Sequence, residues 1–156
     1  MWIGIVGSRK FGECPCVNTA MPIPPTAEWI EHQRICPMLW SRRFVRQIIL
    51  RWAENPDFEG IVSGDQPRGA DGLAKESCRL LGVPYRGFPP KPGPMPFWMR
   101  AYARNQLIVD LAGTLVALYA PGPRSGGTSD TLRRAKLKKI PCWVWDGRWH
   151  GPEETD

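Results

Sequence analysis

The chain has 156 residues, of which 42% are hydrophobic, and it carries a formal net charge of +6 with a pI near 9.3. This length and apolar content favour one globular domain with a sizeable core and exclude a disordered chain. The absence of a long apolar run or a signal-peptide pattern predicts a cytoplasmic protein without a membrane partner. The positive charge fits an anionic partner, a nucleotide or a nucleic acid, although lysines near helix ends explain part of it.

The first predicted element is a buried strand over residues 2–6, a continuous apolar run of the kind found in parallel sheets. Gly7, Ser8 and Arg9 follow at its carboxyl end, which is where open α/β sheets bind ligands. Ser8 can donate a hydroxyl hydrogen bond there, and Arg9 or Lys10 can bind a phosphate. The alternative is a plain turn with solvated cations, which these three residues alone do not exclude.

Residues 12–37 read as an insertion rich in proline and cysteine. Loops of this length commonly carry function, and one role for this segment is a flap over the ligand site. Four of its side chains can bind a structural zinc ion, which would order a segment with few apolar residues: Cys14, Cys16, His32 and Cys36. Their spacing matches no standard zinc finger, so free cysteines and a surface histidine are the alternative. The ligand site itself requires no cofactor.

An amphipathic helix is predicted over residues 38–54, with an apolar stripe that faces the core and arginines on the other side. A second buried strand at 60–63 then runs into a glycine-containing loop and a helix from Gly72 to Leu81. The amides at such a helix start attract anions, and six residues here are predicted to bind ligand: Ser63, Gly64, Arg68, Gly69, Ala70 and Asp71. Arg68 can grip a phosphate, while Asp71 can cap the helix or face a sugar.

A short strand is predicted at 84–88, followed by a proline-rich loop at 89–96 and a helix at 97–112. Arg104 and Asn105 lie in the middle of this helix, where asparagine is a mediocre helix former. A specific hydrogen bond and an ordinary surface pair explain the asparagine equally well from spacing alone.

The clearest strand is predicted at 114–119, and a second glycine loop leads from it into a helix that extends to Lys139. Gly126 and Gly127 let backbone amides face an oxyanion, and Thr128 and Ser129 add hydroxyl groups at the helix start. The last strand is predicted at 141–145. Residues 148–156 are predicted to form a loosely attached polar tail.

An ordered set of motifs therefore runs through the chain: Gly7-Ser8-Arg9-Lys10-Phe11, Val62-Ser63-Gly64, Arg68-Gly69-Ala70-Asp71, Arg104-Asn105 and Gly126-Gly127-Thr128. This set resembles the SLOG superfamily, and within it the small stand-alone YspA-type proteins. The resemblance implies one nucleotide-binding domain over 1–147 with an α/β, Rossmann-like three-layer fold, a mainly parallel central sheet and helices on both faces. It also implies a sensor or processor of nucleotides, and a homo-oligomer by analogy. Two positions depart from the pattern: Asp65 replaces a glycine, and Thr131 replaces the catalytic glutamate of the LOG-type phosphoribohydrolases.

Three functions follow. The first is binding of a nucleotide or nucleotide-derived ligand. The second is hydrolysis of the N-glycosidic bond of a nucleoside monophosphate, for which Asp71 and Asp130 are the candidate catalytic carboxylates and helix capping is the alternative role of each. The third is binding of single-stranded nucleic acid, as in the related DprA proteins, through exposed tryptophans such as Trp40 and Trp98.

Overall fold

The computed structural model describes residues 1–13, 27, 37–124 and 126–154. Within these residues the chain forms one six-stranded sheet: β1 (Trp2–Gly7), β2 (Gly60–Ser63), β3 (Tyr85–Gly87), β4 (Ala112–Leu118), β5 (Cys142–Trp145) and β6 (Trp149–His150). The strand order is β3-β2-β1-β4-β5-β6, and every neighbouring pair is parallel except β5 with β6. The prediction of an α/β fold with a mainly parallel sheet is confirmed.

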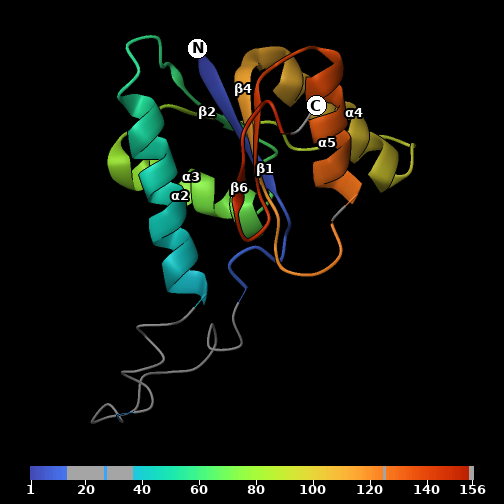
Figure 1. Cartoon of the computed structure of the whole chain (residues 1–156). Helices are drawn as coiled ribbons and strands as arrows, with labels where there is room; N and C mark the ends of the chain where they lie inside the picture. Colours follow the sequence, from blue (N-terminus) through green and yellow to red (C-terminus); the bar gives the residue numbers. More distant parts are fainter. Residues whose placement is uncertain (14–26, 28–36, 125, 155–156) are drawn as a thin grey trace.

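Helices cover both faces of this sheet: α2 (Pro37–Ala53), α3 (Gly69–Leu81), α4 (Phe97–Leu111) and α5 (Gly126–Leu137). Figure 1 shows α2 and α3 on one side of the sheet and α4 and α5 on the other. Each pair of helices buries its own hydrophobic core against the strands, so the predicted three-layer arrangement is confirmed.

The two cores follow from the alternation of side chains along the strands. In β1, Ile3 and Ile5 pack with α2 and α3, whereas Val6 packs with α4 and α5. The predicted amphipathic helix at 38–54 corresponds to α2, in which Val45 and Ile49 are fully buried. The predicted strands and helices therefore form because each presents an apolar face with the period of its own secondary structure.

The C-terminal segment differs from its prediction. A turn at Gly147, where φ is +114°, reverses the chain so that Trp149 and His150 form β6 against β5. The Trp149 ring lies 5.6 Å from the Phe44 ring and 5.5 Å from the Trp145 ring, measured between centroids. The expectation of a loose tail from residue 148 is wrong at this strand, because the tryptophan completes an aromatic cluster that only the folded chain assembles.

No helix in the described part of the chain is long and apolar enough to cross a membrane. The predicted zinc ligands Cys14, Cys16, His32 and Cys36 lie outside the described residues. Inside the described residues, no three side chains of histidine, cysteine, aspartate or glutamate gather into a possible metal site.

Candidate functional site

A cavity of about 600 Å³ lies where β1, β2 and β4 end at their carboxyl termini. Its size is within the range of about 300–1,000 Å³ that is typical of small-molecule sites. The chain crosses from one side of the sheet to the other between β1 and β4, and open α/β sheets bind ligands at such a switch point. Residues from β1, the loop after β2, α3, α4 and α5 line the cavity.

The loop after β1 is tied to the start of α3. A Cβ atom on Gly7 would collide with the carbonyl oxygen of Leu118 and would lie 2.5 Å from the Cβ of Ala70, so glycine is required for this close approach. The carbonyl oxygen of Ser8 accepts a hydrogen bond from the Ala70 amide at 3.3 Å. Gly7, Ser8 and the exposed Arg9 all line the cavity, as their prediction as ligand-binding residues requires.

The same hydrogen bond explains why α3 begins at Gly69 and not at Gly72. The two glycines look like loop residues in the sequence, but the contact with Ser8 orders the first turn. Of the six residues predicted to bind ligand here, Gly64 and Asp71 line the cavity, whereas Ser63, Arg68, Gly69 and Ala70 do not. The Ser63 hydroxyl lies 2.6 Å from the Tyr85 hydroxyl, and Arg68 is an exposed N-cap residue.

Asp65 has a backbone φ of +58°. This left-handed conformation favours glycine, and aspartate is among the other residues that tolerate it best, which accounts for the glycine in the SLOG pattern. The Asp65 carboxylate lies 3.0 Å from the Lys75 ammonium group and accepts a hydrogen bond from the Tyr85 hydroxyl at 3.3 Å. The extra negative charge is therefore directed toward β3 and α3, and Asp65 does not line the cavity.

Asp71 is the buried carboxyl group of the site. Only 6% of its surface is exposed, and it lines the cavity from the first turn of α3. Its Oδ2 atom accepts a hydrogen bond from the Gln66 amide at 3.4 Å, while Oδ1 has no hydrogen-bond partner among the described residues. Burial raises the pKa of Asp71 to about 7, against the opposing effects of the Arg104 charge and the amides of Gln66 and Gly64. Near neutral pH this carboxyl group can therefore both donate and accept a proton.

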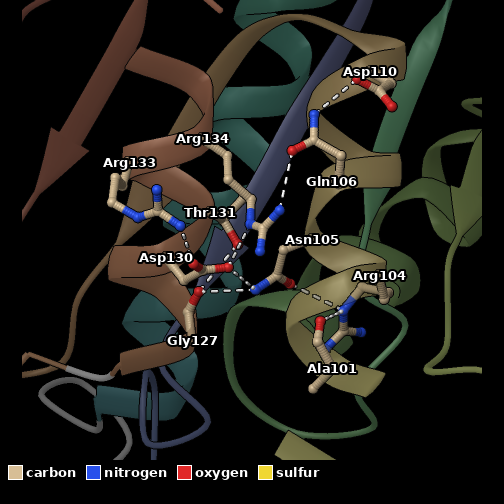
Figure 2. Close-up of polar contacts among 10 residues, drawn as sticks. All are labelled: Ala101, Arg104, Asn105, Gln106, Asp110, Gly127, Asp130, Thr131, Arg133 and Arg134. Carbon is tan, nitrogen blue, oxygen red and sulfur yellow. Dashed lines mark hydrogen bonds and ion pairs between the residues drawn. The ribbon is translucent and has the colours of Figure 1, made fainter. Parts of the chain in front are cut away.

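Arg104 is a buried cation beside Asp71. It is 8% exposed, lines the cavity, and donates hydrogen bonds to the carbonyl oxygens of Gly64 and Phe88. Its Nε atom lies 3.1 Å from the Asn105 Oδ1 atom, as Figure 2 shows. Burial lowers the pKa of Arg104 and the negative charge of Asp71 opposes this effect. Of the two interpretations that the sequence left open for Asn105, the structure therefore shows the specific hydrogen bond and not a surface pair.

Asn105 links Arg104 to α5, as Figure 2 shows. Its Nδ2 group donates to the Gly127 carbonyl oxygen at 3.3 Å and to the Asp130 carboxylate at 3.1 Å. The Asp130 carboxylate also pairs with Arg133 at 2.9 Å and with Arg134 at 2.7 Å. Although partial burial opposes the effect, these hydrogen bonds hold the pKa of Asp130 below its usual value.

This network changes the interpretation of Asp130. Asp130 does not line the cavity, and both of its oxygen atoms are engaged by neighbouring donors. The structure therefore does not favour Asp130 as a catalytic carboxylate; it is a residue that positions the start of α5. Asp71 remains the candidate catalytic residue, because among the described residues that line the cavity it is the one with a carboxyl group.

The start of α5 opens into the same space. Gly127, Thr128 and Thr131 line the cavity, whereas Gly126 and Ser129 do not. A Cβ atom on Gly127 would meet nothing within 4 Å, so the backbone here is accessible to a ligand. The Thr131 hydroxyl donates to the Gly127 carbonyl oxygen at 3.0 Å. A threonine hydroxyl thus forms part of the cavity wall at the start of α5.

Sequence reasoning placed Lys10 beside the ligand but did not place several other cavity residues in the nucleotide site: Gln66, Phe97, Trp98 and Tyr102. The aromatic members begin α4, directly after the proline-rich loop. Two consecutive aromatic residues at the exposed start of a helix were the signal that could have identified them.

Comparison with known proteins adds no assignment: the chain matches no family model, and no curated protein matches it significantly. The functional argument therefore depends on the geometry of the cavity and on the motifs of the sequence.

Proposed function

We propose that the protein binds a nucleotide or nucleotide-derived ligand in this cavity, and acts as a sensor or processing protein. The observation that carries the proposal is the convergence of Arg9, Lys10 and the glycine-containing start of α5 on one cavity at the switch point of the sheet. Free amides at a helix start and nearby cations stabilise a phosphate group. The SLOG-like order of the motifs supports the same class of ligand.

The charges of the cavity favour one position for the phosphate. The described lining residues include three cationic side chains, Arg9, Lys10 and Arg104, and one carboxyl group, that of Asp71. Asp71 belongs to the first turn of α3, and when its carboxyl group is ionised its negative charge repels a phosphate from that helix start. At the start of α5, Gly127 and Thr128 line the cavity, whereas the Asp130 carboxylate is paired with two arginines and does not line it. We therefore assign the phosphate to α5 and to the exposed cations.

Arg9→Ala should weaken nucleotide binding about 10- to 100-fold, because it removes a charged hydrogen-bond donor from the phosphate. Isothermal titration calorimetry with nucleoside mono-, di- and triphosphates measures this change. Arg68→Ala is the matched control, since Arg68 is exposed but lies outside the cavity lining. Gly127→Val should also weaken binding by filling space at the start of α5. If none of these nucleotides bound the intact protein, the proposal would fail.

Asp71 favours a second candidate function, N-glycoside hydrolysis of a nucleoside monophosphate. The carboxyl group lines the cavity and has a pKa of about 7, so it can remove a proton from an attacking water molecule. The water oxygen would bond to the anomeric carbon as the bond to the base nitrogen breaks, and the base nitrogen would take up the proton that Asp71 removed from the water. Transition-state charge on the sugar would be stabilised by the same carboxylate.

If the protein is such a hydrolase, Asp71→Asn should reduce base release about 100-fold or more, which is the usual contribution of a general base. Chromatography of the products measures base release, and calorimetry on the same variant checks that the nucleotide still binds. Intact nucleotide after long incubation with concentrated wild-type protein would exclude the hydrolase and leave the binding function.

A further inference from the structure

Three aromatic side chains of α4 form one side of the cavity, and we call Phe97, Trp98 and Tyr102 the aromatic wall. Phe97 is 48% exposed and Trp98 is 60% exposed, although both rings are large and apolar. Single exposed apolar residues are common on proteins, but adjacent ones inside a concave site mark a binding surface. The aromatic wall is therefore a surface on which we expect part of the ligand to bind.

Two other tryptophans of the described chain pack against an aromatic neighbour. Trp40 stacks on Phe44 at 4.6 Å between centroids, and Trp145 packs on Phe44 at 4.8 Å. Trp98 has an edge contact with Tyr102 at 5.9 Å and remains the most exposed tryptophan of the described chain. More than half of its surface is therefore available to a ligand.

The wall is held in place before any ligand arrives. Arg100 lies 5.5 Å from the centre of the Phe97 ring and donates hydrogen bonds to the carbonyl oxygens of Lys91 and Met95, each at 3.0 Å. These bonds attach the proline-rich loop to the first turn of α4. A preorganised surface loses little conformational entropy on binding, so its stacking energy appears as affinity.

The wall also adjoins the phosphate position. Arg9 lies 5.9 Å from the centre of the Phe97 ring, and the hydroxyl of Tyr102 is 3.1 Å from the place of a Cβ atom on Gly126. One cavity thus combines cations, a helix start and the exposed aromatic side chain of Trp98. A ligand that satisfies all three carries an anionic group at one end and a planar aromatic group at the other.

Resting on the proposed function, we propose that the base of the nucleotide stacks on Trp98, so that the cavity selects nucleoside phosphates over sugar phosphates. Stacking on aromatic side chains accepts every base, because each base has a π face. The wall therefore supplies affinity for a base without choosing among the four. Removing the base should weaken binding about 5- to 150-fold, the equivalent of one stacked base.

The test is calorimetry on the full chain with the four nucleoside monophosphates and with ribose 5-phosphate. The wild-type protein should bind the nucleotides about 5- to 150-fold more tightly than the sugar phosphate. Trp98→Ala should reduce that ratio toward one while affinity for ribose 5-phosphate stays unchanged. Met95→Ala is the matched control, because Met95 is 50% exposed next to the wall but does not line the cavity.

The outcomes separate this inference from the proposed function. If nucleotides bind but the ratio is one, or survives in Trp98→Ala, base stacking is wrong and nucleotide binding stands. If neither nucleotides nor ribose 5-phosphate bind, the proposed function fails together with the inference. The last measurement uses a single-stranded oligonucleotide of 12 nucleotides. If it binds to the aromatic wall while mononucleotides do not bind, the wall is a nucleic-acid-binding surface and the inference is overturned.

Discussion

Between pH about 4 and pH about 7, Asp71 alone should lower the free energy of unfolding of the wild-type protein by about 4 kcal/mol. The folded state raises the pKa of Asp71 from 3.8 to about 7, so in this window the folded protein holds a proton that the unfolded chain has released. Stability that depends on this bound proton is fully present below the unfolded pKa. It is lost as the pH rises through the folded pKa.

The measurement is chemical denaturation of the wild-type protein and of Asp71→Asn at several pH values from 4 to 8. The variant carries an uncharged group at all of these values, so the difference between the two curves isolates the titration of Asp71. The titration of Asp130 does not overlap with this window. The folded state lowers the pKa of Asp130, so its contribution to the free energy of unfolding is lost only as the pH falls below about 4. Parallel curves for the two proteins across the window would contradict the prediction.

Arg104→Leu should destabilise the fold by about 3–5 kcal/mol, because it removes the donor from buried acceptors and leaves the Asp71 carboxyl group without its neighbouring positive charge. The side chain donates to the carbonyl oxygens of Gly64, Phe88 and Ala101 and to the Asn105 side chain, and so joins the loop after β2 to α4. Arg104→Lys keeps the charge but loses the forked geometry, so its effect should be intermediate.

The substitution should also move the pH dependence. The charge of Arg104 lowers the pKa of Asp71, so in Arg104→Leu the loss of stability assigned to Asp71, which begins near the unfolded pKa, should extend above pH about 7. Denaturation curves for Arg104→Leu, with and without Asp71→Asn, measure this shift. Arg43→Leu, an exposed change on α2, is the control and should alter stability by less than about 0.5 kcal/mol. An unshifted profile would mean that the two side chains do not interact.

Much of the fold could be predicted from local patterns. The apolar runs at residues 2–6 and 60–63 form the central strands β1 and β2, and the amphipathic stripe at 38–54 forms α2. These elements are recognisable because a buried face leaves a periodic mark in the sequence. The start of α3 and strand β6 could not be predicted in this way, because distant contacts hold them: Ser8 orders the first turn of α3, and Phe44 packs on Trp149 of β6.

Local sequence patterns were enough to predict the fold class and to place the glycine-containing loops at the carboxyl ends of the strands. Which side chains of those loops line the cavity depends on contacts between distant segments, and these patterns do not show it. Arg9 and Arg68 have the same chemistry, yet Arg9 lines the cavity and Arg68 faces away from it. Asp71 and Asp130 are both acidic residues near a helix start. One is buried beside the cavity with an unpaired oxygen, and the other is neutralised by Asn105 and two arginines. The difference arises because segments far apart in the chain bury a carboxylate and provide its hydrogen-bond partners. Burial and partners set the pKa of the carboxylate and decide whether it can contact a ligand, so the local sequence does not determine either property.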